Sequence, residues 1–212
     1  MLPVTWQTGI CAARASAERE IKPKSLVTRS MGNAGAKVPD SIAMAEVPPG
    51  KVGDLIQRMH QIIQITLNQH RCQGESNDGL ELGACFLEPD LGHLVFAGAR
   101  FSLFRVNGGD VEEIKGTKQG LGYRGIAASQ AYAEAAFDLS PGMAFYMSSD
   151  GLIEQVGGDN RRMFGKKRFK SLISRMQSLS MAEQKDRIFQ SLADYQGDEA
   201  RRDDVSVIGF RV

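Results

Sequence analysis

Three aspartates stand where a β-strand is expected to end or to begin. Asp150 follows the apolar run MAFYMSS, and Asp203 and Asp204 come directly before the run VSVIGF. Carboxylates at the ends of separate strands can converge on Mg²⁺ or Mn²⁺, hard cations that take oxygen ligands. Because side chains alternate along a strand, Asp203 and Asp204 point to opposite faces, so at most one of them easily shares a cavity with Asp150.

The same aspartates have an ordinary structural interpretation. Asp-Gly, here Asp150-Gly151, is a common turn sequence, and paired aspartates before a strand often form a solvated loop end. The residue types alone therefore leave both a metal site and two solvated turns open.

The segments that must position these aspartates follow an α+β order. Apolar residues at steps of three and four predict a helix from about Val52 to Leu67. Ser180 with Glu183 three residues later has the spacing of a capping box and predicts the start of a later helix. Runs of strand character predict an antiparallel meander of about six strands, then two helices and a returning strand. The strand runs are 80–88, 93–99, 101–106, 111–116, 131–139, 143–149 and 205–212, and the two helices lie near 169–176 and 180–195.

Length and charge exclude several classes of protein. The 212 residues suffice for one domain with a sizeable core, and the net charge of +1 gives no reason to expect nucleic acid or an anionic membrane as partner. No apolar run reaches the length of a membrane span, and the start of the chain lacks a secretory signal, so we expect a cytoplasmic protein. Cys11, Cys72 and Cys85 form no CxxC pair, which disfavours a zinc site or a disulfide framework.

The first 49 residues differ from the rest of the chain. They hold few large apolar residues in any regular period and include the Gly- and Pro-punctuated stretch MGNAGAKVPD. We expect residues 1–49 to be poorly ordered, or not to match the pattern of the domain that follows. We expect residues 50–212 to form that domain.

Several motifs resemble a known family. The strings MAFYMSSDGLIEQ, FGKKRFKSLI and RRDDVSVIGFRV look like the closing signature of the SpoIIE-type branch of the protein phosphatase 2C (PPM) family. NDGLELGACFLE, LVFAGARFSLF, GGDVEEIKG and LGYRG fall in the family's order as well. The resemblance covers about residues 48 to 212, and separate motifs in the right order are more specific than any one of them.

The resemblance implies a fold and a site. The family fold is two stacked antiparallel sheets flanked by helices, with two Mn²⁺ or Mg²⁺ ions that activate a water for attack on phosphorus. Carried over residue by residue, Asp150 and Asp203 match catalytic metal ligands. Gly151 matches the glycine that lets the chain turn tightly behind the metal, and Asp204 is more plausibly a neighbour.

The family's opening motifs do not appear in this sequence. Neither its early Gly-Asp motif nor its D-x-x-GHG-type motif is visible before Pro48. We therefore expect a sandwich that is incomplete at the N-terminus and one metal ion or none. This suggests a truncated or frameshifted product, or a fragment that pairs with another chain.

Two functions follow from the resemblance. The first is a metal-dependent serine/threonine protein phosphatase that acts on a phosphorylated STAS-type anti-anti-sigma regulator in a bacterial partner-switching pathway. The second is a catalytically dead or truncated module that docks the regulator without hydrolysing it. Neither function needs nucleic acid or a membrane. The sequence leaves open whether the chain forms a homodimer.

Overall fold

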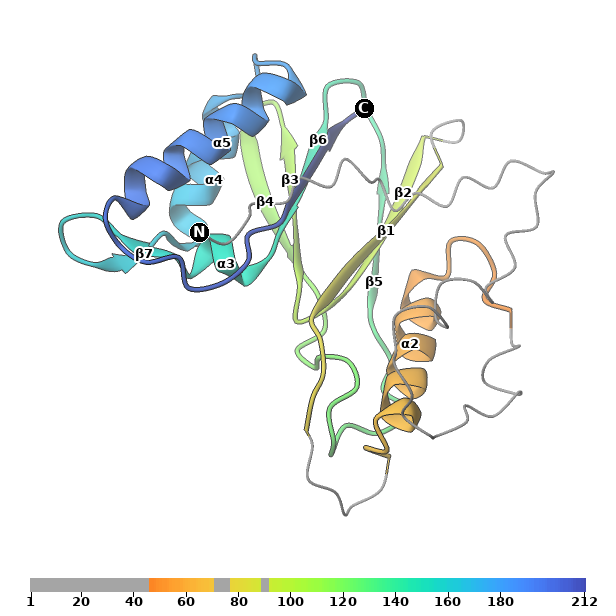
Figure 1. Cartoon of the computed structure of the whole chain (residues 1–212). Coiled ribbons are helices and arrows are strands. Elements are labelled where there is room, and N and C mark those ends of the chain that lie inside the picture. Colours follow the sequence, from red (N-terminus) through yellow and green to blue (C-terminus); the bar gives the residue numbers. More distant parts are fainter. Residues whose placement is uncertain (1–45, 71–76, 89–91) are drawn as a thin grey trace. The chain divides into compact units, whose positions relative to one another are not determined.

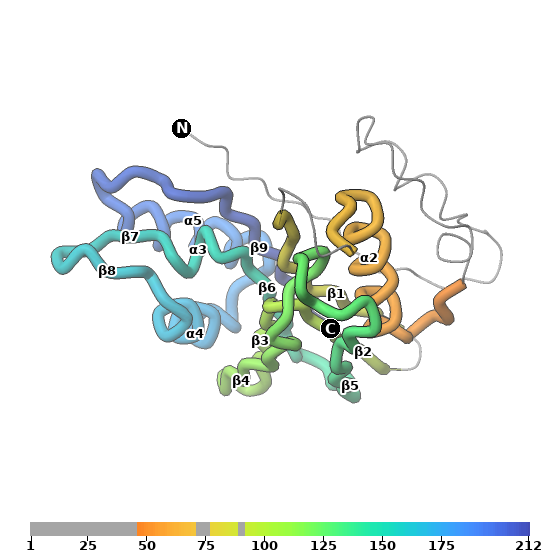
Figure 2. The backbone as a smooth tube through the Cα atoms, turned by 90° about the horizontal axis from the view of Figure 1, so that it is seen from below, coloured from red at the N-terminus to blue at the C-terminus, as the bar shows by residue number. Residues whose placement is uncertain are grey.

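A computed structural model of the chain describes residues 46–70, 77–88 and 92–212 (Figures 1 and 2). These residues divide into two compact units. We call them the α2 unit, which takes in the described residues up to Arg100 together with Gly116–Phe137, and the α4–α5 unit, made of Phe101–Lys115 and Asp138–Val212.

The α2 unit is a three-stranded sheet covered by a helix. Its elements are α2 (Val52–Thr66), β1 (Leu82–Glu88), β2 (His93–Ala99) and β5 (Glu134–Asp138), and its sheet order is β1-β2-β5. The strands β1 and β2 are antiparallel, with Leu82 opposite Ala99 and Glu88 opposite His93. The apolar stripe of α2 packs against one face of β2, and the buried contact includes Val52, Ile56, Ile63, Val95, Ala97 and Ala99.

The α4–α5 unit is a four-stranded sheet with helices on one face. The sheet order is β4-β3-β6-β9, formed by β3 (Ser102–Asn107), β4 (Asp110–Lys115), β6 (Ala144–Ser148) and β9 (Val207–Arg211). Gly108 and Gly109, at φ 59° and 93°, form the tight turn between β3 and β4 that the Asn-Gly-Gly-Asp sequence predicts.

Helices α4 (Gly165–Arg175) and α5 (Met181–Gln196) lie side by side against this sheet (Figure 1). The shared core includes Phe104, Tyr146, Phe169, Ile173, Ile188 and Leu192. The predicted capping box is confirmed: Ser180 accepts from the Glu183 amide, and the Glu183 carboxylate accepts from the Ser180 amide. Between β6 and α4 lie the short helix α3 (Asp150–Ile153) and a hairpin of β7 (Val156–Gly157) and β8 (Arg162–Met163), which Figure 2 shows beside α3.

The predicted helices and strands are confirmed, but the single six-stranded meander is wrong. β5 pairs with β2, and β3 pairs with β6, so the strands fall into two main sheets. The segment 1–49 lies outside the described residues up to position 45, and the boundary at residue 50 stays a prediction. In the described part of the chain, no helix combines the length and apolar character that a membrane crossing requires.

Candidate functional site

The end of β6 and the beginning of β9 lie next to each other. The two strands are antiparallel, with Ser148 opposite Val207, and the Ser149 amide continues the ladder by donating to the Ser206 carbonyl at 2.9 Å. Asp150 follows β6 by two residues, and Asp203 precedes β9. The pairing of these strands therefore brings the two acidic motifs to the same end of the sheet, where β6 ends and β9 begins.

Ser149 fastens these two segments to each other through its side chain. Its hydroxyl donates to the Asp204 carbonyl at 3.0 Å and accepts from the Ser206 amide at 2.9 Å. Ser149 occupies the N-cap position of α3 but makes no side-chain cap to that helix. The hydroxyl thus bonds the approach to β9 instead of satisfying the helix that it precedes.

Gly151 packs directly against the backbone of the acidic pair. A Cβ added to this buried glycine would lie 2.3 Å from the Asp204 carbonyl oxygen and 3.2 Å from that of Asp203. Contacts below 3.0 Å essentially never occur for a real Cβ, so an L side chain would push the two segments apart. The close approach requires glycine at this position.

The three aspartates themselves are exposed. Asp150 is the first residue of α3, and one carboxylate oxygen of Asp203 accepts from the Asp204 amide at 2.7 Å. Accessible carboxylates of this kind suit a hard divalent cation. Within residues 46–70, 77–88 and 92–212, however, no group of three or more His, Cys, Asp or Glu is placed to hold a metal ion. Asp150 and Asp203 alone would supply two carboxylates, which are too few for a two-ion centre.

The loop before Asp203 is held by the segment that follows α3. The Gln155 amide group donates to the Ala200 carbonyl at 3.1 Å, and Arg161 forms an ion pair with Glu199 at 2.8 Å. Arg201 donates to the Gln196 side chain at 2.5 Å, and burial lowers the pKa of its guanidinium. Arg201 is therefore a structural member of this loop.

A second polar cluster in the α2 unit is structural. His60 is fully buried; its Nδ1 accepts from the Gly122 amide at 2.9 Å, and its Nε2 lies 3.1 Å from the Ala127 carbonyl. This arrangement fits the neutral tautomer protonated on Nε2, and burial lowers the pKa of the ring. The Gln64 side-chain amide donates to the carbonyls of Tyr123 and Ile126. The Gln69 side-chain amide donates to the carbonyls of Asp78 and Gly122. These side chains fix the 120–127 loop to the helix.

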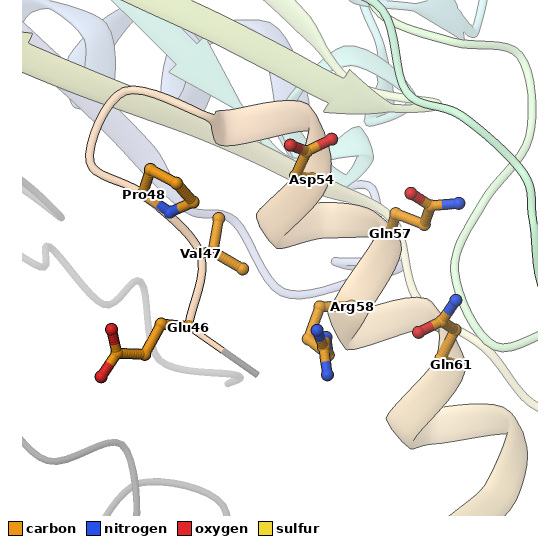
Figure 3. Close-up of a pocket in the computed structure, with 7 residues that line it drawn as sticks. All are labelled: Glu46, Val47, Pro48, Asp54, Gln57, Arg58 and Gln61. Atoms are coloured by element: carbon orange, nitrogen blue, oxygen red, sulfur yellow. The ribbon is translucent and has the colours of Figure 1, made fainter. Parts of the chain in front are cut away.

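A hollow of about 240 Å³ lies beside α2 (Figure 3). Polar side chains of the helix face the segment from Glu46 to Pro48 across it, and the helix contributes Asp54, Gln57, Arg58 and Gln61. It holds both acidic and basic groups, and Asp150 and Asp203 belong to the other unit.

Sequence reasoning singles out Asp150, Gly151 and Asp203, and their role in the site stays a prediction; it misses the hydrogen bonds of Ser149. The consecutive serines at the end of the expected strand were the available signal, because one of two neighbouring strand residues must face the adjoining segment. Arg100, in the turn between β2 and β3, pairs with Glu81 at 3.1 Å.

A protein-family model described as Stage II sporulation protein E (SpoIIE) matches residues 25–212. Among solved structures, the SiaA-PP2C domain of Pseudomonas aeruginosa superposes with a TM-score of 0.62 and 26% identity, covering 78% of this chain and 71% of that chain. The PP2C phosphatase domain of SpoIIE from Bacillus subtilis, with a fragment of its regulatory domain, gives a TM-score of 0.56 at 15% identity over 82% of this chain and 47% of that chain.

A third structure, PppA, described as a key regulatory component of T6SS in Pseudomonas aeruginosa, gives a TM-score of 0.51 at 18% identity and covers 84% of this chain and 81% of that chain. No curated protein sequence matches. The two structures below 25% identity show the fold alone, and that fold confirms the expected class of antiparallel sheets with flanking helices.

Proposed function

The chain belongs to the SpoIIE family of PP2C-type (PPM) serine/threonine protein phosphatases, and on that premise we propose that it removes phosphate from a phosphorylated STAS-type anti-anti-sigma regulator. The observation that carries this proposal is the junction of β6 and β9, where Ser149 and Gly151 hold Asp150 next to the backbone of Asp203 and Asp204. The identity of the substrate comes from the family resemblance.

In this proposal Asp150 and Asp203 hold a Mn²⁺ or Mg²⁺ ion. Such an ion, when bound, lowers the pKa of a coordinated water and neutralises charge on a phosphoryl group. The chain's own contribution is positional. Ser149 and Gly151 hold the two backbone segments together, which places both aspartates at the same end of the sheet.

A second candidate is a module that binds the phosphorylated regulator without hydrolysing it. The observation in its favour is that the described residues include no group of three or more His, Cys, Asp or Glu placed to hold a metal ion. Two-ion chemistry needs more negative charge than two carboxylates supply.

Hydrolysis of p-nitrophenyl phosphate with Mn²⁺ separates the two candidates. The enzyme predicts turnover that depends on Mn²⁺ and falls at least about 100-fold in Asp150→Asn and in Asp203→Asn. Asp159→Asn is the matched control, because Asp159 is an exposed aspartate in the turn between β7 and β8. Absence of turnover at every Mn²⁺ concentration, with the phosphorylated regulator still bound, supports the binding module and overturns the enzyme.

A further inference from the structure

Helix α4 and the strand before it carry a concentration of positive charge. Residues 161–175 read RRMFGKKRFKSLISR, with seven basic residues and no acidic one, in a chain with 26 basic and 25 acidic residues overall. Without this segment the chain has 19 basic and 25 acidic residues, so the positive charge is concentrated in 161–175 and the remainder is acidic.

Three of the seven cations have partners within the α4–α5 unit. Arg161 pairs with Glu199 at 2.8 Å, and Lys166 pairs with Glu113 at 2.7 Å. The Arg168 guanidinium lies 4.7 Å from the centroid of the Tyr195 ring and donates to the carbonyls of Met163 and Phe164. These three are explained by the packing of the unit.

Three others form a group that we call the α4 basic stripe: Lys167, Lys170 and Arg175. They spread over about 140° of the helix circumference, on the side of α4 away from the buried Phe169 and Ile173. Lys167 and Arg175 are exposed, and Lys170 is half-buried. None of the three makes an ion pair with the described residues of the chain, so the stripe presents its charge to solvent.

Lys167 does not help the helix to form. It lies in the first turn of α4, which has no acidic residue, and Phe164 at the N-cap gives no side-chain cap. Cations are unfavourable near the positive N-terminal end of a helix, and Lys167 and Lys170, three residues apart, repel each other. Arg175 in the last turn is favourably placed, so Lys167 and Lys170 are the cations here that break a local rule without structural gain, which marks a candidate functional surface.

We propose that the α4 basic stripe docks an acidic surface of the partner protein, a proposal that rests on the proposed function for the identity of that partner. Helix α3, which begins with Asp150, packs against α4 within the same unit (Figure 2). A partner held by the stripe is thereby kept at the unit that carries the acidic motifs. The occupant is a protein, because three cations on a chain of net charge +1 are too few for the broad positive surface that nucleic acid or an anionic membrane needs.

The test uses two pairs of peptides. Each pair shares one central sequence and is extended by twelve residues rich in Glu or, as control, rich in Gln; one pair carries a central phosphoserine and the other does not. Fluorescence anisotropy measures binding of the unphosphorylated pair at low and high salt, and hydrolysis of the phosphorylated pair and of p-nitrophenyl phosphate is followed in parallel.

The wild type should prefer the Glu-rich peptide by about tenfold at low salt and lose the preference at high salt. The triple variant Lys167→Glu, Lys170→Glu, Arg175→Glu should lose it at low salt and keep its activity on p-nitrophenyl phosphate. The control triple Lys115→Glu, Lys118→Glu, Arg187→Glu makes the same change in net charge at other exposed positions and should keep the preference.

Equal losses in both triple variants, or a preference that survives in the stripe variant, overturn the proposal. Binding of single-stranded DNA or phosphatidylserine vesicles as tight as that of the Glu-rich peptide, and lost in the same variant, overturns the assignment to a protein. If neither the wild type nor either triple variant hydrolyses any substrate, the proposed enzymatic function fails. The anisotropy measured with the unphosphorylated peptides still shows whether the α4 basic stripe is a docking surface.

Discussion

The Ser149 hydroxyl donates a hydrogen bond of 3.0 Å to the main-chain carbonyl of Asp204. The two residues are 55 positions apart, and the bond joins the segment that carries Asp150 to the segment that carries Asp203. Since the same hydroxyl also accepts from the Ser206 amide, one small side chain fixes the register of both acidic motifs.

Ser149→Ala should weaken Mn²⁺ binding about tenfold, because it removes both hydrogen bonds without touching a carboxylate. Isothermal titration with Mn²⁺ measures the effect directly, and turnover of p-nitrophenyl phosphate at saturating Mn²⁺ should fall much less. Ser149→Thr keeps the hydroxyl and should restore binding.

Ser148→Ala is the matched control for that change. Ser148 is the preceding residue, and its hydroxyl is buried without a hydrogen-bond partner. Its removal should leave Mn²⁺ affinity unchanged. Equal losses in the two alanine variants would mean that Ser149 contributes only to general stability.

Gly151→Ala should destabilise the fold by about 1–3 kcal/mol and also abolish Mn²⁺ binding, because the new methyl group would meet the Asp204 carbonyl. Gly157→Ala provides the comparison. A Cβ there would lie 1.9 Å from the Tyr195 carbonyl, a similar clash that is made with α5 and not with the Asp203–Asp204 backbone.

Urea unfolding and Mn²⁺ titration on both glycine variants separate the two effects. We expect similar losses of stability, with Mn²⁺ binding lost in the Gly151 variant and kept in the folded Gly157 variant. Retained Mn²⁺ affinity in Gly151→Ala would contradict the importance of the close approach.

Acid should destabilise the α2 unit through His60. Burial lowers the pKa of this ring in the folded state, so the unfolded chain takes up the proton first as the pH falls. The contribution of neutral His60 to stability is therefore full above the unfolded pKa of about 6.5 and decreases below it until the folded ring also titrates. A protonated Nδ1 could no longer accept from the Gly122 amide.

Thermal unfolding midpoints measured between pH 7.5 and 5.0 test whether acid lowers the stability of the fold. His60→Gln should have a lower midpoint at pH 7.5 and a smaller further loss on acidification than the wild type. His70→Gln, a change at an exposed histidine near the end of the same helix, should behave as the wild type. A wild-type midpoint that rises on acidification would show the opposite linkage.

Helices and strands could be predicted from the sequence because their signals are local. The apolar steps of α2, the Asn-Gly-Gly-Asp turn and the Ser180–Glu183 capping box each depend on neighbouring residues. The division into two sheets could not be predicted in this way. It depends on which strands pair, and the pairing of β3 with β6 joins segments about 40 residues apart.

The acidic motifs could be singled out by residue type and resemblance. The hydrogen bonds that hold the two motifs together could not be predicted. Serine is a common helix-capping residue, and Ser149 precedes α3. Only the antiparallel pairing of β6 with β9 shows that its hydroxyl bonds the segment before β9 instead. The hydrogen bonds of His60 could not be predicted either, since the backbone groups that it binds lie more than 60 residues away.

The central claim is that Asp150 and Asp203 bind the same divalent ion, and paramagnetic broadening by Mn²⁺ tests it most directly. In two-dimensional amide spectra, small amounts of Mn²⁺ should broaden the signals of Ser149–Leu152 and of Asp203–Ser206 together, and Asp150→Asn should abolish the broadening of both segments. Broadening of one segment alone, or broadening of Asp203–Ser206 that persists unchanged in Asp150→Asn, would contradict the account.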